Sequence, residues 1–387
     1  MTQPDLANIS PGPRIDFLDI SRFLGMILVY YGHIMEQFMY LGNTTAGAQY
    51  KYIYTFHMAF FFLLSGWVHN PAKLRQPGRK FLAYEAASRL VPYVTFSLLM
   101  CATTLLFTGW FPLGELSTAQ SYWNGFVNTL RGFPAFNVPT WFLAMLITTE
   151  LLHRLVGRFL ESDVTLVVAA VLFYLGGYWL NNEVSFVIRK DGPSLNFWFV
   201  HEAPVVYAFF LVGVLLRRHS FLYGRVRRAW LLTGAALCAL VVLLTFNLNQ
   251  GPWRLIPAVV IVLSGHGHIF WFPFTALVGS LMMLLLAKAC DPGRWLAWMG
   301  KNTLVIFCLN GVFYHYVNPR FAKWFMALFE PSWWSVTLSC VTLTALSLAL
   351  CVPVVVCLTR WLPQLVGRPS QQGPLLPRLV RPSRHVL

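Results

Sequence analysis

The sequence predicts an all-α membrane protein, a polytopic helix bundle of about ten transmembrane helices with both termini in the cytosol. Three observations lead to this fold class. The chain of 387 residues is 57% hydrophobic and only 11% charged, whereas a soluble domain carries about 25% charged residues. Aromatic side chains make up 16% of the chain, as expected for helices with aromatic belts at the membrane interfaces. The basic residues, finally, gather on one side of the apolar stretches.

A helix needs roughly 20 apolar residues to cross a bilayer, and the predicted spans follow from that length. They are 18–40, 52–68, 88–109, 139–156, 164–181, 199–216, 229–247, 270–289, 303–320 and 335–360. The apolar run 255–264 is too short to span a membrane, so we expect an outer loop or a re-entrant segment there. Residues 1–362 form the predicted membrane domain. The Pro, Gln and Arg content of the cytosolic tail, 363–387, predicts disorder or contact with the anionic inner leaflet.

The distribution of basic residues sets the orientation. With the N-terminus inside, 22 of the 29 Lys and Arg residues fall on the inner side and 7 on the outer side. This asymmetry is the positive-inside pattern of membrane proteins. It also accounts for the formal net charge of +15, so the basic character indicates a lipid bilayer and no nucleic-acid partner.

No metal site and no disulfide framework is predicted. The seven cysteines stand singly and form no CxxC pair. His266 and His268 offer only two ligands, which is an incomplete metal site. We expect them to be polar groups of an outer loop, and the pair His201-Glu202 to stand at the outer end of 199–216.

The first predicted span carries four ionisable residues, Asp19, Arg22, His33 and Glu36. Arg22 and His33 are 11 positions apart, which on an α-helix is about 20° beyond three full turns and a rise of about 16.5 Å. They therefore share one face, with Arg22 near the cytosolic end and His33 in the outer half. Asp19 lies one turn before Arg22 and can orient it. Glu36 lies one turn after His33, where it can fix the imidazole tautomer or raise its basicity.

Each of these residues has a structural alternative. Arg22 alone could be a snorkelling anchor, and a lone histidine could be a packing residue. Because Arg22 and His33 lie on one face at two depths, we favour a role in binding and catalysis for both. Arginine offers a planar cation for phosphate, and histidine is the usual general base near neutral pH. Such a pair suits a donor whose anionic end stays in the cytosol while its reactive end enters the membrane.

Other polar residues at membrane depth are candidates because charged groups are costly there. His57 lies at about the depth of His33, on the second predicted span. Arg89 stands at the cytosolic start of the third span, either as a second phosphate partner or as a boundary residue. Glu150 lies near the middle of the fourth span and ranks above the His201-Glu202 pair on depth alone.

Six sequence blocks, in order along the chain, match one known family. Arg22 and His33 fit its motif of Arg or Lys, ten residues, then His; the further blocks are YIYTFHMAFFFLLSGW at 52–67, SRLVPY at 88–93, PTWFLAMLITTEL at 139–151, APVVYAFFLVGVLL at 203–216 and WMGKNTLVIFCLN at 298–310. Through these blocks the chain resembles the acyltransferase-3 membrane proteins, particularly the branch related to sugar O-acetylases. The resemblance covers nearly the whole chain.

The resemblance implies a ten-helix O-acyltransferase of the bacterial inner membrane. Acyl-CoA, with acetyl-CoA as the default, would enter from the cytosol, and the acceptor would be a hydroxyl of a cell-envelope or exported glycan or glycolipid. His33, assisted by Glu36, would be catalytic; the acyl-CoA-binding residues would be Asp19, Arg22, Arg89, Lys301 and Asn302; and the tunnel or acceptor residues would be His57, Trp141, Glu150 and Asn310.

Two points qualify the resemblance. Relatives often have a histidine where this chain has Asn310, and His315, about a turn and a half later, is the possible substitute. The alternative function is a transporter or flippase for a lipid-linked sugar or a small acid, since many spans with buried polar groups and a basic inner mouth serve transport too. No inverted repeat supports that alternative.

Overall fold

The computed structural model describes residues 16–107, 116–187, 194–249 and 258–381, and this part of the chain is helical almost throughout. The α-helices are α1 (Asp16–Tyr40), α2 (Thr44–Tyr54), α3 (His57–Val68), α4 (Ala72–Arg75), α5 (Gly78–Glu85), α6 (Val91–Leu106), α7 (Ala119–Leu130), α8 (Trp141–Val156), α9 (Asp163–Glu183), α10 (Ala203–His219), α11 (Arg228–Thr245), α12 (Trp271–Ala289), α13 (Arg294–Lys301), α14 (Thr303–Val312), α15 (Asn318–Leu328) and α16 (Trp333–Trp361). Within the described residues the only β-structure is an isolated antiparallel bridge between Val260 and Gly265. The predicted all-α class is confirmed.

Five described helices are long and apolar enough to cross a membrane. They are Gly78–Leu106, Asp163–Glu183, Arg228–Leu248, Trp271–Ala289 and Trp333–Trp361, and a pair bent by 68°, Arg294–Lys301 with Thr303–Leu328, could add a sixth. Helices of this kind indicate an integral membrane protein. The count of ten spans and the cytosolic position of both termini stay predictions. Four predicted spans coincide with helices that are either rich in charged residues, as α1 is, or short, as α3, α8 and α10 are.

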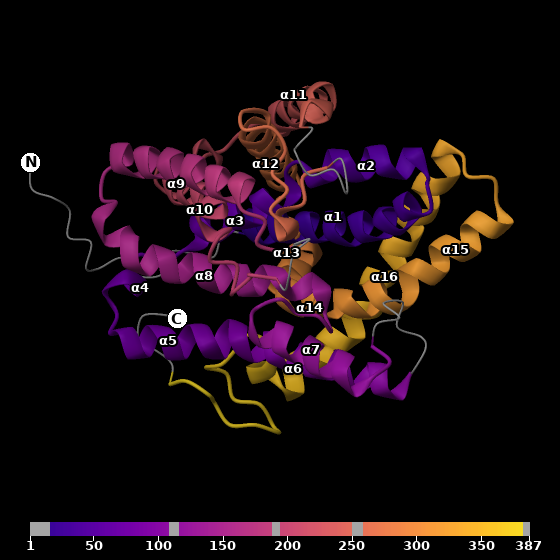
Figure 1. Cartoon of the computed structure of the whole chain (residues 1–387). Coiled ribbons are helices and arrows are strands. Elements are labelled where there is room, and N and C mark those ends of the chain that lie inside the picture. The colour runs from indigo at the N-terminus through magenta and orange to yellow at the C-terminus, as the bar shows by residue number, and fades with distance from the viewer. Residues whose placement is uncertain (1–15, 108–115, 188–193, 250–257, 382–387) are drawn as a thin grey trace, which may run out of the picture.

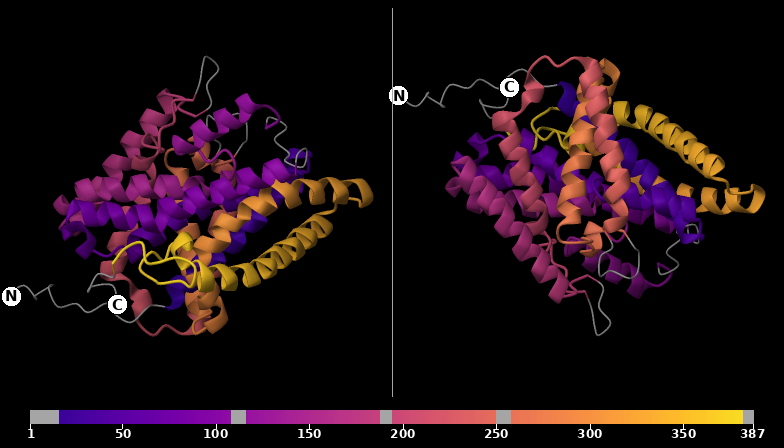
Figure 2. Two further views of the ribbon diagram at one scale, coloured as in Figure 1. Left: turned by 90° about the horizontal axis from the view of Figure 1, so that it is seen from below. Right: turned by 90° about the horizontal axis from the view of Figure 1, so that it is seen from above.

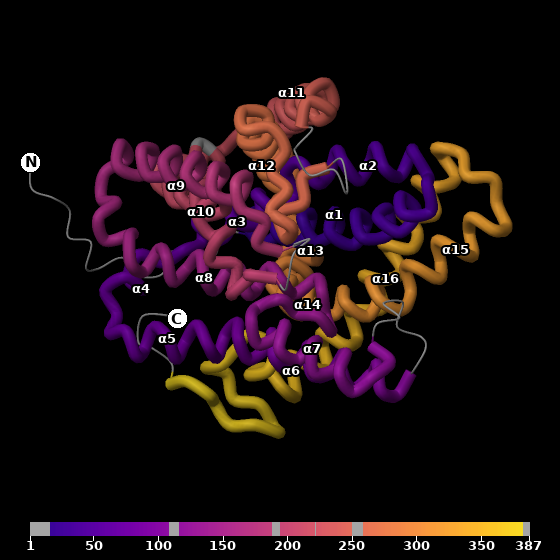
Figure 3. Tube along the Cα trace, in the orientation of Figure 1, coloured from indigo at the N-terminus to yellow at the C-terminus, as the bar shows by residue number. Residues whose placement is uncertain are grey.

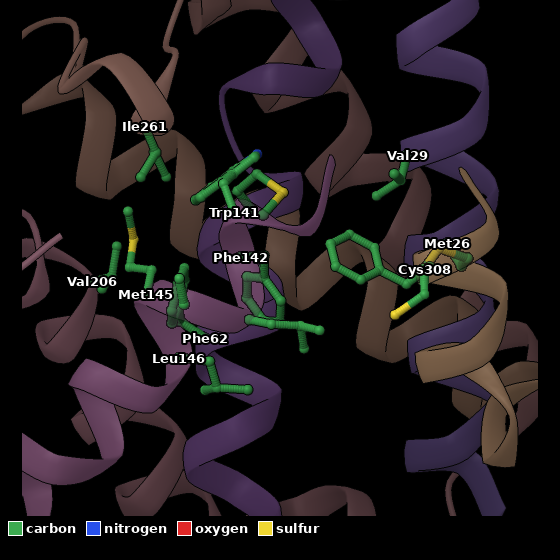
Figure 4. Packing of buried hydrophobic residues seen from close by; sticks show 14 of the residues in the cluster. Met26, Val29, Phe62, Trp141, Phe142, Met145, Leu146, Val206, Ile261 and Cys308 are labelled. Carbon is green, nitrogen blue, oxygen red and sulfur yellow. The ribbon is translucent and has the colours of Figure 1, made fainter. Parts of the chain in front are cut away.

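The helix α1 runs through the centre of the bundle (Figure 1) and contacts α2, α12, α13, α15 and α16. The buried apolar side chains in the middle of α1 join the largest core cluster. There Trp141 and Phe142 lie between Ile261 and Val206 on one side and Met26 on the other (Figure 4). The peripheral helices α11 and α12 lie against each other, and α15 and α16 leave the main bundle on one side (Figure 2). The polar face of α1 is therefore enclosed by other helices over much of its length.

Two glycines allow α3 and α10 to cross at very short range. A Cβ on Gly66 would lie 1.9 Å from the carbonyl oxygen of Phe210, and one on Gly213 would lie 1.9 Å from the carbonyl oxygen of Leu63. No side chain fits in either space. Small residues that let backbones approach are typical of helix pairs in membranes, and this crossing fixes α3, and hence His57, against the core.

The tail, expected to be disordered or to contact the inner leaflet, is folded back under α5 and α6 (Figure 3). Gln364 is fully buried, and its side-chain amide donates to the carbonyl oxygens of Gln371 at 3.0 Å and Leu376 at 2.7 Å. Gly367, with φ of +82°, allows the turn that follows Pro363–Val366 within this tail. One buried amide thus organises residues 363–381 in a way that their composition did not indicate, while 382–387 lie outside the described residues.

The segment after α11 enters the bundle. Of the apolar run 255–264, residues 258–264 are described, and Val259 and Ile261 are buried in the main core. The backbone N–H of Val260 donates to the carbonyl oxygen of Gly265 at 2.6 Å, and that of Gly265 donates back at 3.0 Å. The described part is therefore a buried turn, which fits a re-entrant segment better than a solvated loop.

Candidate functional site

The four ionisable residues of α1 form two pairs. At one end, Arg22 Nη1 donates to Asp19 Oδ1 at 2.7 Å. At the other, His33 Nδ1 lies 3.0 Å from Glu36 Oε2. These are the pairings expected from the spacing along the helix. Asp19 is almost completely buried, whereas the Arg22 side chain beside it keeps 27% exposure at this end of the helix.

The carboxylate of Glu36 is the centre of a hydrogen-bond network. Its Oε2 faces His33, and its Oε1 accepts from the hydroxyl of Tyr40 at 2.8 Å and from that of Tyr314 at 3.4 Å. Because a carboxylate can only accept, the Nδ1 of His33 carries the proton in this contact, and Nε2 is then the basic nitrogen. The arrangement prepares His33 to take a proton at Nε2 while Glu36 stabilises the cation that results.

Aromatic residues connect His33 to two further histidines. The Tyr54 hydroxyl lies 3.5 Å from His33 Nδ1, and its ring lies 4.4 Å from the ring of His57. The Tyr314 ring lies edge-on to His33 at 4.8 Å and to His315 at 4.9 Å. Tyr54 thus lies between His33 and His57, which the sequence placed at about the same depth, and Tyr314 connects His33 to His315.

His315 reaches this position through a local widening of its helix. Residues Phe313–Val317 form a single π-helical turn between α14 and α15. Such turns often occur at functional sites because the extra residue re-aims a side chain. His315 is buried, and the sequence offered it as the possible substitute for the absent family histidine at Asn310. Asn310 is itself fully buried on α14, one helical turn before Tyr314.

At the other end of α1, α13 lies directly against the helix. A Cβ on Gly300 would lie 1.9 Å from the carbonyl oxygen of Asp19. This approach brings Lys301 Nζ to 3.7 Å from Asp16 Oδ1. From the tail, Arg368 Nη2 donates to Asn302 Oδ1 at 2.6 Å. Lys301 and Asn302 therefore do lie at the same end of the bundle as Arg22, together with a third cation from the C-terminal segment.

Arg89 has a different environment. Its guanidinium is bonded to Glu150 and lies 3.1 Å from Glu85, which in turn accepts from Lys73 Nζ at 2.8 Å. Two buried carboxylates thus face two cations. Arg89 was expected at the acyl-CoA site and Glu150 along the tunnel. In the structure the two belong to one ion-pair cluster, and neither contacts His33 or the residues around it. Trp141 opens α8 and is packed on Phe142 and Phe199 within the core.

Sequence reasoning missed the tyrosines and the tail. Tyr40 follows Glu36 by four positions, so helical spacing could have indicated it. Tyr54 and Tyr314 reach the site from other helices, and nothing in the sequence marks Arg368. Among the described residues no group of three or more His, Cys, Asp or Glu side chains could hold a metal ion.

A family model described as an acyltransferase domain, of acyltransferase family 3, matches residues 15–352 of the chain. Searches of the curated proteins and of the solved structures found no match. The family match covers both charged pairs of α1 and all of the residues around His33. The helical composition, the apolar helices and this match together show that the chain belongs to the acyltransferase-3 family and is a membrane acyltransferase.

Proposed function

We propose that this protein is an O-acyltransferase that moves an acyl group, with acetyl as the default, from cytosolic acyl-CoA to a hydroxyl of a cell-envelope or exported glycan or glycolipid. The expected location is a bacterial inner membrane. The observation that carries the proposal is the single helix α1, with a basic end at Arg22 and a histidine–carboxylate pair at His33 and Glu36. These are the groups that a donor with a phosphate-bearing end and a reactive thioester requires.

In the proposed reaction, His33 Nε2 removes the proton of the acceptor hydroxyl. The oxygen attacks the thioester carbonyl, the new C–O bond forms, and the C–S bond breaks. The CoA thiolate leaves and takes the proton from His33, so the protein returns to its starting state. Glu36 keeps Nδ1 protonated throughout and stabilises the transient imidazolium. The same groups also allow a route through an acyl-His33 intermediate.

The basic end of α1 would hold the diphosphate and the ribose phosphate of CoA. Arg22 is partly exposed beside Asp19, and Lys301 lies near Asp16. The planar guanidinium can bind phosphate oxygens in pairs, whereas the ammonium of Lys301 provides a point charge. Because the Arg22–His33 separation predicts a rise of about 16.5 Å, the donor would have to extend along α1 to place its thioester at His33.

The test uses purified protein in lipid nanodiscs and acetyl-CoA labelled in the acetyl group. We expect acceptor-dependent release of CoA, and we expect His33→Ala to abolish it while the protein still inserts into membranes. His219→Ala is the matched control, because that histidine is exposed and pairs with Asp163 at the end of α10. Native turnover by His33→Ala would refute the assignment of the base.

Arg22 is tested separately from the chemistry. Arg22→Ala should chiefly raise the KM for acyl-CoA, and Arg22→Lys should be partly active because it keeps the charge but loses the planar fork. An unchanged KM would exclude phosphate contact at Arg22. Movement of a lipid-linked sugar or small acid across the membrane without CoA turnover would instead favour the transporter alternative. Mass-spectrometric detection of acetylated His33 without acceptor would distinguish the two-step route from direct transfer.

A further inference from the structure

A second group of buried polar side chains lies away from His33, where α9, α10 and α12 meet the segments 194–202 and 258–270. We call it the α9–α10 polar cluster. Its members are Asn181, Asn196, His201, Glu202, Asn249, Ser264 and His266, each with at most 5% exposure. Buried polar groups are costly unless they are satisfied, so seven of them in one region require an explanation.

Direct contacts hold the cluster together. The Asn181 side chain donates to the carbonyl oxygen of His201 at 2.9 Å. The carboxylate of Glu202 lies 2.5 Å from His266 Nε2. Asn249 lies beside Gly267, whose Cβ, if present, would be 3.3 Å from it. Three loops and one helix therefore converge on the same region.

Much of this polar surface has no partner within the described part of the chain. The atoms without a hydrogen bond there are Asn181 Oδ1, Asn196 Nδ2, His201 Nε2, Glu202 Oε2, Asn249 Oδ1 and Ser264 Oγ. An unsatisfied buried polar atom costs about 1–3 kcal/mol, and native proteins bury few of them without a reason. A ligand that pairs with these atoms is one such reason.

Backbone strain is concentrated in the same loops. Within the described residues, only Trp198, Phe199 and Ser264 are non-glycine residues with positive φ, at 48°, 54° and 57°. Each such residue costs about 1–3 kcal/mol and persists only where the surroundings enforce it. All three lie within the segments that carry the cluster, so the chain holds these loops in a specific shape.

The chemistry of the free atoms indicates a neutral ligand rich in hydroxyl groups. The oxygens of Asn181, Glu202 and Asn249 can only accept, so the ligand must donate hydrogens. None of the seven described members of the cluster is a Lys or Arg that would favour an anion, and the described residues contain no ligand set for a metal cation. The ring of His201 stacks on the ring of Phe186 with the two centres 4.5 Å apart, so flat rings lie beside the polar atoms. Binding sites for small molecules often combine aromatic rings with a few polar groups.

The cluster is connected to the His33 site through the segment 258–266. Val260 packs in one hydrophobic cluster with Ile34, the residue that follows His33 on α1. Val260 is also paired through its backbone with Gly265, which directly precedes His266. One short turn therefore joins the polar cluster to the hydrophobic cluster that holds the chain neighbour of His33.

We infer that the α9–α10 polar cluster binds a neutral sugar ring of the acceptor and delivers one of its hydroxyls toward His33. The sugar-binding part follows from the unpaired atoms alone, and the delivery part rests on the proposed function. Glu202 and Ser264 are binding residues in this inference, and neither touches the donor site at Arg22. Substitutions there should change acceptor binding and leave the KM for acyl-CoA unaltered.

The test measures saturation-transfer NMR between the protein in nanodiscs and the methyl pyranosides of glucose, galactose and mannose. We expect transfer to at least one sugar, and at least tenfold weaker binding in Glu202→Gln. Ser264→Ala removes a single hydroxyl, so it should weaken sugar binding several-fold, which is less than Glu202→Gln. Ser97→Ala is its matched control, because Ser97 is also a buried hydroxyl without a partner in the described chain but lies on α6. Octyl glycosides, corrected for binding to empty nanodiscs, distinguish a lipid-linked sugar from a glycan chain.

The outcomes separate this inference from the proposed function. Sugar binding that Ser264→Ala weakens and Ser97→Ala does not, in a protein without CoA turnover, would support the binding site and refute acyl transfer. Turnover of acetyl-CoA without binding of any of the sugars would refute the inference alone. Equal binding by the native protein and by both Glu202→Gln and Ser264→Ala would also overturn it.

Discussion

Replacing Glu36 tests whether the network around His33 serves catalysis. The carboxylate accepts from His33 Nδ1 at 3.0 Å, from Tyr40 at 2.8 Å and from Tyr314 at 3.4 Å. A hydrogen bond to a charged group contributes about 1.5–3 kcal/mol. If the bond to His33 is realised in the transition state, Glu36→Ala should lower kcat about 10- to 150-fold, since each 1.36 kcal/mol is about tenfold in rate. Glu36→Gln keeps a carbonyl oxygen that can accept from His33, so it should lower kcat less than Glu36→Ala does.

The assay is steady-state release of CoA by purified protein, with acyl-CoA and acceptor varied in turn. The KM for acyl-CoA should stay the same, because Arg22 lies at the far end of α1. Tyr40→Phe is the graded control: its hydroxyl donates to the carboxylate and not to His33, so this change should lower kcat less than Glu36→Ala does. A native kcat in a folded Glu36→Ala protein, or a change in KM alone, would refute a role for Glu36 in orienting His33.

Two further predictions concern stability. Gly66→Ala places a Cβ 1.9 Å from the carbonyl oxygen of Phe210, so it should destabilise the protein by at least about 1–3 kcal/mol in thermal unfolding. Gly176→Ala, which meets no atom within 4 Å, is the control, and equal melting temperatures would contradict the packing argument. Arg89→Leu leaves Glu150 buried without its cation and should cost about 3–5 kcal/mol. The double replacement with Glu150→Leu should recover part of that loss at an unchanged KM for acyl-CoA, because Glu85 still keeps Lys73. A raised KM in the folded double variant would show that Arg89 binds the donor.

Much of the fold class and half of the site could be predicted from local patterns. Low charge and long apolar runs predict membrane helices because lipid imposes the same requirement on every span. Helical spacing predicted the two pairs on α1, since residues three apart on one helix are neighbours whatever surrounds them. The helices α1 and α3 coincide with predicted spans, but neighbouring helices cover most of their side chains, and their length and composition alone do not establish a crossing.

The sequence by itself determined an all-α membrane acyltransferase with Arg22 and His33 on one face of its first long helix. Only the tertiary structure decided which residues complete the site. It brought Tyr314 to Glu36 from a helix nearly 280 positions away, paired Arg89 with Glu150, and joined Glu202 to His266. The physical reason is that composition and spacing act within one helix, whereas these contacts depend on how helices cross. Those crossings are fixed by close backbone approach at a few glycines and by buried turns, and neither can be read from a periodic pattern.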